Sequence, residues 1–153
     1  MISIIVTLSF PAFRSFFIHQ HVSYYTQELE SLIEFAREQA QAKGESMVLC
    51  SSQDGLQCDS HGKWDGFLLV RSRTEVLKRS QAFSKGYQLH WAGGFSGSSL
   101  LRFEATGFTE VEQGSFYICP PIAYAHLAKA LIVLKSGRLR VSHDYSKLAG
   151  ICR

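Results

Sequence analysis

The sequence lacks the short motifs that common enzyme classes require. It has no G-x-S-x-G nucleophile motif, no H-E-x-x-H metal motif and no Walker phosphate loop. Its six histidines are scattered, and His143 and Asp144 are sequence neighbours, which point to opposite faces of a strand. No internal repeat or low-complexity stretch is present. We therefore expect a single domain that acts by binding, with no catalytic residue, metal or cofactor.

The sequence also lacks a hydrophobic run of full membrane-spanning length. Residues 1–13 are mostly apolar but fall short, by roughly a third, of the ~20 residues that cross a bilayer. The basic start and cleavage site of a secretory signal are missing too. A buried N-terminal helix and a signal-like stretch are both possible interpretations. We favour a third, in which residues 1–19 are the inner half of a membrane helix whose first residues are missing from the sequence as written, Met1 being an internal methionine.

Cysteine is sparse and even in number. Cys50 and Cys58 are close in sequence, and Cys119 and Cys152 form a distant pair. The even count predicts two disulfides and an oxidising compartment, although proximity in sequence leaves three connectivities open. Zinc bound by Cys50, Cys58 and His61 is an alternative, but this C-x7-C-x2-H spacing matches no common zinc finger. Reduced core cysteines are the remaining alternative.

Net charge is only +3, but its distribution is uneven. Residues 129–153 contain one acidic and six basic residues, which leaves +5 in this segment. Such asymmetry favours a polyanionic partner for the C-terminal segment, while a solvated basic end without a partner is the alternative. The six basic residues are Lys129, Lys135, Arg138, Arg140, Lys147 and Arg153.

Residues 20–43 have the apolar spacing of an amphipathic helix, and no glycine interrupts the chain before Gly44. Lys43 and Gly44 are typical of a helix end. Steps of three and four residues place one apolar set on the buried face: Val22, Tyr25, Leu29, Leu32, Ile33, Ala36 and Ala40. The expected exposed face carries Gln20, Thr26, Gln27, Glu30, Glu34, Arg37, Glu38 and Gln41.

After Gly44 the pattern changes to short β segments separated by glycine and polar turns, so residues 46–153 are expected to form a β domain. Trp64 and Trp91 are expected in its core. A glycine-rich loop at residues 92–99 is followed by a strand and not by a helix, which disfavours a nucleotide site. The expected strands are residues 46–50, 64–71, 87–91, 100–103 and 115–119, and residues 75–80 fit either a strand or a helical turn.

The last unit reads as a hairpin, with strands at 127–135 and 138–141 joined by a two-residue turn, Ser136-Gly137. This register puts Lys135, Arg138 and Arg140 together on the exposed face. Like charges placed opposite each other destabilise a sheet, and a bound phosphate backbone would relieve that cost. The expected pairs are Lys135 with Arg138, Leu134 with Leu139, Val133 with Arg140 and Ile132 with Val141, the Leu, Ile and Val side chains of the two all-apolar pairs facing the core.

Several stretches in this order resemble the FimT/GspH family of minor pilins and pseudopilins, and more closely its FimT side. They are residues 4–16, 28–50, 54–55, Trp64 with Gly66, 101–108, 115–119 and 137–140. The sequence departs from the family at its start, because neither the leader glycine nor the early glutamate of such proteins is present before Ile2.

The resemblance implies an α+β, type IV pilin-like fold. In that fold a long N-terminal helix has its first half in the membrane or filament core and its second half on an antiparallel β-sheet domain, here residues 20–153. It implies a bacterial inner-membrane protein before assembly, with its globular part in the periplasm and later in the filament. Other pilins are then the expected partners.

The family also implies two alternative functions. Some FimT-like members bind DNA for natural transformation through a C-terminal G-R-x-R motif, present here as Gly137 to Arg140. Arginines at i and i+2 of a strand project about 7 Å apart from one face, close to the spacing of successive phosphates, and can grip them bidentately. Lys135, Lys147 and Arg153 would extend this non-specific surface. GspH-like members of type II secretion systems act by protein contact alone.

Overall fold

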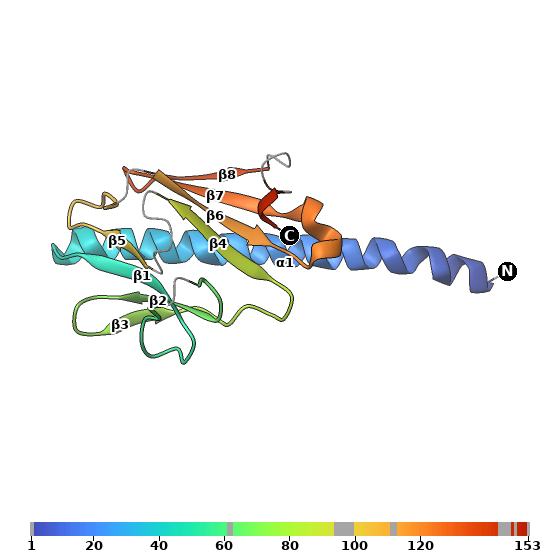
Figure 1. The fold of residues 1–153 in the computed structure, drawn as a ribbon, viewed down its shortest axis with the longest axis horizontal. Coiled ribbons are helices and arrows are strands. Elements are labelled where there is room, and N and C mark those ends of the chain that lie inside the picture. Colours follow the sequence, from blue (N-terminus) through green and yellow to red (C-terminus); the bar gives the residue numbers. More distant parts are fainter. Residues whose placement is uncertain are drawn as a thin grey trace.

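The computed structural model describes residues 2–60, 63–93, 100–110, 113–143, 148 and 150–152, with side chains from residue 12 onward. One long helix, α1 (Ile2–Lys43), lies along two four-stranded antiparallel sheets (Figure 1). The first sheet has the order β3-β2-β1-β5, and the second has the order β4-β6-β7-β8. The strands are β1 (Met47–Ser52), β2 (Phe67–Arg71), β3 (Val76–Arg79), β4 (Gln88–Gly93), β5 (Leu100–Phe103), β6 (Gln113–Cys119), β7 (Lys129–Leu134) and β8 (Leu139–Ser142). The α+β class expected from the sequence is confirmed.

The buried face of α1 is the one that periodicity predicts. All seven apolar positions of the predicted stripe are buried, the most exposed being Tyr25 at 4%. Thr26 was expected on the exposed face, and that prediction is wrong. Its side chain is 4% exposed, because its Oγ1 donates a hydrogen bond to the Val22 carbonyl oxygen (2.7 Å) and so needs no water. Arg37, also expected on the exposed face, is only partly exposed.

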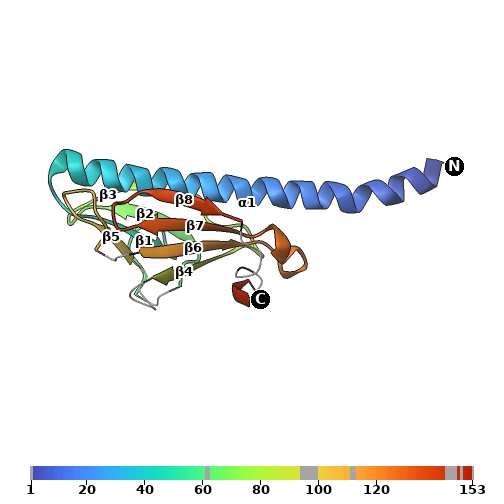
Figure 2. The same cartoon turned by 90° about the horizontal axis from the view of Figure 1, so that it is seen from above.

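The N-terminal part of α1 projects beyond both sheets (Figures 1 and 2). Phe13, Phe16 and Phe17 on this part are more than half exposed, at 62%, 57% and 58%. Over the ranges that the structure describes, no helical stretch has the length and hydropathy needed to span a membrane.

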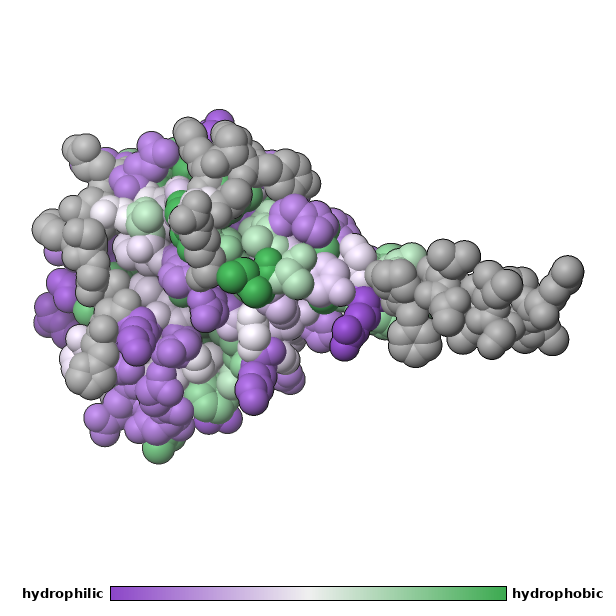
Figure 3. Space-filling view, turned by 45° about the vertical axis from the view of Figure 1, so that its right-hand side comes forward, coloured by the Kyte–Doolittle hydropathy of each residue, from purple (hydrophilic) through white to green (hydrophobic). Residues whose placement is uncertain are grey.

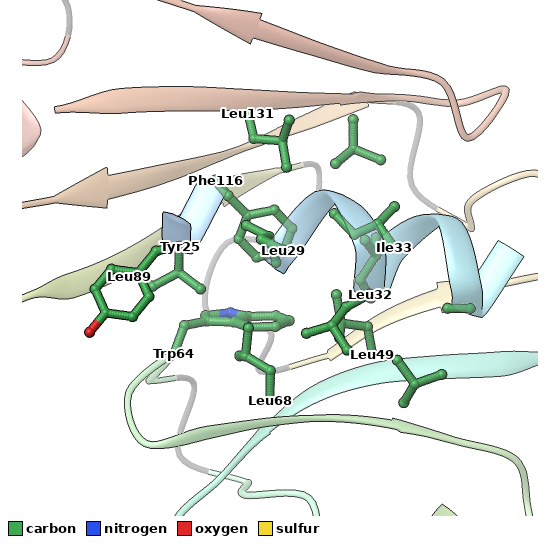
Figure 4. Close-up of a cluster of buried hydrophobic side chains, with 14 of the residues drawn as sticks. Tyr25, Leu29, Leu32, Ile33, Leu49, Trp64, Leu68, Leu89, Phe116 and Leu131 are labelled. Carbon is green, nitrogen blue, oxygen red and sulfur yellow. The ribbon is translucent and has the colours of Figure 1, made fainter. Parts of the chain in front are cut away.

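The core lies between α1 and the two sheets (Figure 4). Leu29 and Ile33 of the helix lie between the side chains of both sheets, with Trp64 packed edge-on against Phe116 at a centroid distance of 4.9 Å. Trp91 packs on Phe116 as well, at 4.5 Å. Trp64 is therefore a core residue, as expected, whereas Trp91 is only partly buried and packs against the edge of the core. The outer surface mixes hydrophilic and hydrophobic residues on the face shown in Figure 3.

The structure settles one ambiguous segment and shifts the start of one predicted strand. Residues 75–80, which fitted strand or helix, contain strand β3. The predicted strand 127–135 begins two residues later, because a short 3₁₀ helix, Ile122–Leu127, follows Pro121. Most of the predicted glycine-rich loop, residues 94–99, lies outside the described residues.

Two disulfides join Cys50 to Cys58 and Cys119 to Cys152, the pairs that are neighbours in sequence order. The first closes the loop after β1, and the second holds the C-terminal residues against β6. Cys50 and Cys58 are bonded to each other, which excludes the zinc site considered for them, and His61 lies outside the described residues.

Candidate nucleic-acid interface

The β7–β8 hairpin turns through three residues, not two. The Leu134 N–H donates to the Arg138 carbonyl (2.9 Å), and the Gly137 N–H donates to the Leu134 carbonyl (2.8 Å). Gly137 has φ of +78°, as in a type I turn closed by a left-handed residue. The predicted register is therefore wrong by one residue: Val133 pairs with Leu139, Ile132 with Arg140 and Leu131 with Val141.

This shift exchanges the side chains that β7 presents to the core. Leu131 and Val133 are fully buried, whereas Ile132 and Leu134 were expected in the core and instead lie on the outer face. Arg138 and Arg140 remain exposed, two residues apart on this outer face, as the sequence predicted. Lys135 is exposed too, but it lies in the turn and does not face Arg138 across the strands.

Gly137 is buried where the turn meets another loop and the helix. A Cβ added to it would lie 2.6 Å from the Gly107 carbonyl oxygen and 2.9 Å from the Arg37 Cδ. Real Cβ atoms do not approach backbone that closely. The glycine of the G-R-x-R sequence therefore sets the position of the turn, and the arginines supply its charge.

Arg37 is a cation of this site that sequence reasoning missed. Its side chain packs under Gly137, and its Nε is buried without a hydrogen-bond partner among the described residues. Periodicity placed Arg37 on the exposed face of α1, and only the fold shows that its side chain meets the hairpin turn and is partly buried there.

The turn is also fixed from the side. The Thr109 N–H donates to the Lys135 carbonyl oxygen at 2.9 Å, and Gln41 Nε2 donates to the Thr106 carbonyl at 3.1 Å. The first of these holds the hairpin end through its backbone, and the second holds the neighbouring loop on α1, so neither depends on the arginine side chains. Lys147 and Arg153, the other basic residues predicted to bind DNA, lie outside the described residues.

Acidic side chains do not neutralise the two hairpin arginines within the described ranges. The ion pairs found there are Lys43 with Glu75 (3.5 Å) and Arg102 with Glu110 (3.7 Å), and neither Arg138 nor Arg140 takes part. No group of three or more His, Cys, Asp or Glu side chains is placed to hold a metal in this part of the chain. The hairpin is thus suited to binding an anion by charge.

Comparison with known protein families identifies one family. A family model described as Type II transport protein GspH matches residues 25–137. Comparison with curated protein sequences gives no significant match.

Three solved structures share the fold. The type IV minor pilin FimU of Pseudomonas aeruginosa strain PAO1 has a TM-score of 0.63 at 17% identity, covering 83% of this chain and 91% of that one. A second crystal form of FimU gives 0.58 at 18% identity, covering 78% and 90%. The minor pseudopilin EpsH from the type 2 secretion system of Vibrio cholerae gives 0.56 at 15% identity, covering 80% and 96%.

The family model covers well over half of the chain, and the long helix with antiparallel sheets is the architecture of these structures. The chain therefore belongs to the GspH family of minor pilins and pseudopilins.

Proposed function

We propose that this protein is a FimT-like minor pilin that binds DNA non-specifically through the β7–β8 hairpin and so supports DNA uptake. The observation that carries the proposal is the exposure of Arg138, just before β8, and of Arg140 within it, on one face and without a carboxylate partner among the described residues. The +5 charge of residues 129–153, six basic against one acidic, supports it.

The geometry suits phosphate and not base recognition. β8 is the edge strand of the second sheet, and Arg138 and Arg140 are exposed on the outer face of this edge. Guanidinium groups about 7 Å apart on such a face fit successive phosphates, which fix position but carry no sequence information. DNA of any sequence would then bind with modest affinity that falls steeply with salt.

The test is a fluorescence anisotropy titration of the full chain with unrelated DNA duplexes at two salt concentrations. Arg138→Ala combined with Arg140→Ala removes two phosphate contacts, and we expect the slope of log affinity against log salt to fall by about 1.8. Arg14→Ala with Arg79→Ala removes the same charge at exposed positions elsewhere and serves as the matched control. If the hairpin variant binds DNA with the affinity and salt slope of the wild type, the hairpin is not the DNA site.

A second function, a pseudopilin that acts by protein contact alone, is favoured by Phe13, Phe16 and Phe17, which project from α1 with more than half of each side chain exposed. We propose that this end of α1 lies in the inner membrane before assembly and against other pilins afterwards. An absence of DNA binding by the wild type at low salt would leave this second function in place of the first.

A further inference from the structure

A second basic surface lies on the outer face of the first sheet. It is a groove of about 410 Å³ at the end of the molecule where α1 ends. Three arginines line it, and nothing in the proposed hairpin site uses them. Its lining includes Arg71, Arg73, Arg102, Ser46, Val48 and Cys58.

Strand pairing accounts for this cluster. Val48 of β1 is opposite Arg71 of β2 on one side and opposite Arg102 of β5 on the other. Residues directly opposite each other share a face, so both arginines lie on the outer face, where Val48 is half-buried. Two strand spacings put the Cα atoms of the arginines about 10 Å apart.

Two of the three arginines of the groove take part in neither ion pair found among the described residues. Arg102 is paired with Glu110 at 3.7 Å, and the two others are Arg71 and Arg73. Arg71 is held by its own turn, since its Nε donates to the Ser72 carbonyl (3.2 Å) and its Nη2 to the Arg73 carbonyl (3.5 Å). A guanidinium has five N–H donors, so a positioned Arg71 retains donors for an anion. On the other side of Arg73, Glu45 and Glu104 line an adjacent pocket and limit how far the basic surface extends.

The groove is joined to the hairpin by backbone hydrogen bonds. The Glu110 N–H donates to the Arg102 carbonyl (3.0 Å), and the preceding Thr109 N–H donates to the Lys135 carbonyl (2.9 Å). Residues 109 and 110 thus lie between β5 and the hairpin turn, which places the backbones of Arg102 and Lys135 about two strand spacings apart, or ~10 Å. Figures 1 and 2 show β5 and the β7–β8 turn at the same end of the molecule.

We propose that the groove of Arg71, Arg73 and Arg102 is a second phosphate-binding site, which holds the backbone of the same DNA that the hairpin binds. The inference rests on the proposed function. One nucleic acid then crosses from the second sheet to the first, and each site raises the effective concentration of DNA at the other. Arginine is suited to both sites because it binds phosphate in a bidentate manner.

The experiment compares salt slopes for the full chain on one duplex of about 20 base pairs, long enough to reach both sites at 3.4 Å per base pair. Arg71→Ala with Arg73→Ala leaves the Arg102–Glu110 pair intact. We expect it to lower the slope by about 1.8, and the variant of all four arginines to lower it by about 3.6. Arg71→Lys with Arg73→Lys keeps the charge and is expected to retain most of the slope while weakening affinity. Thermal unfolding checks that each variant is folded.

The outcomes separate the two proposals. If the Arg71/Arg73 variant matches the wild type while the Arg138/Arg140 variant loses binding, the groove proposal is overturned and the hairpin function stands. The reverse pattern would make the groove a DNA site by itself, and it would contradict both the hairpin function and the binding of one DNA across the two sites. If the Arg14/Arg79 control lost as much DNA affinity and salt slope, both effects would follow from net charge alone, and both proposals would be overturned. An absence of DNA binding by the wild type would overturn both as well.

Discussion

Replacing Gly137 by alanine tests how the hairpin turn is held against the rest of the fold. Gly137 has φ of +78°, and an added Cβ would lie 2.6 Å from the Gly107 carbonyl oxygen. Two costs therefore add. Holding alanine in a left-handed conformation costs about 1–2 kcal/mol, and forcing an extra carbon into a packed contact costs about 1–3 kcal/mol.

Gly44 allows the two costs to be separated. It also has positive φ, +65°, but an added Cβ there meets no heavy atom within 4 Å. Gly44→Ala carries the conformational cost alone. The two variants should therefore differ by the packing cost, about 2 kcal/mol, which corresponds to about 4–8 °C in Tm for a domain of this size.

The assay is thermal unfolding of the full chain followed by circular dichroism, with both disulfides intact. We expect Gly44→Ala to lower Tm by about 2–8 °C and Gly137→Ala to lower it by several degrees more. Equal Tm values for the two variants would show that the turn does not pack against Gly107 and Arg37, and would refute this account of the glycine in the G-R-x-R sequence.

Two further predictions concern the loop after β1 and the C-terminal residues. The backbone N–H groups of Leu56 (2.8 Å) and Gln57 (3.0 Å) donate hydrogen bonds to the Asp54 carboxylate and hold its pKa below its ordinary value. The Asp54 charge therefore stabilises the fold above pH ~4, and this stabilisation is lost as pH falls through the lowered pKa of the folded state. The Tm of the wild type should exceed that of Asp54→Asn near neutral pH, and the difference should shrink at acid pH. A difference that stays constant with pH would contradict this account. Cys119→Ser with Cys152→Ser opens a disulfide of sequence separation 33 and should cost about 3–4 kcal/mol. An unchanged Tm would show that the C-terminal residues are held by other contacts.

The apolar stripe of α1 could be predicted, because one helix packed on two sheets needs a single continuous apolar stripe. The burial of Thr26 could not be predicted, since a polar side chain suggests exposure. Its hydroxyl instead donates to a carbonyl one turn back in the same helix. The general rule failed there for a local reason. Short polar side chains on a helix can be satisfied without solvent, and the sequence carries no sign of which ones are.

The hairpin register shows a different limit. Ser136-Gly137 is a good two-residue turn signal, but a glycine is equally suited to the left-handed position that closes a three-residue turn. Both alternatives use the same residues and differ only in the pairing across the strands. The Arg71 and Arg102 groove was out of reach for another reason: its members come from β2 and β5, and only the strand order brings both beside β1.

The exposure of the arginines survives the register error because it depends on their position after the glycine. In the observed turn the residue after Gly137 pairs with Leu134 on the outer face, so the first and third residues after the glycine point outward. The second, Leu139, points inward, opposite buried Val133, and is half-buried. To expose two cations at one edge strand, this turn therefore requires the order glycine, arginine, any apolar residue and arginine. The x of G-R-x-R is then an inward-facing, half-buried position that packs against the core, and apolar substitutions there would preserve both the packing and the charged face.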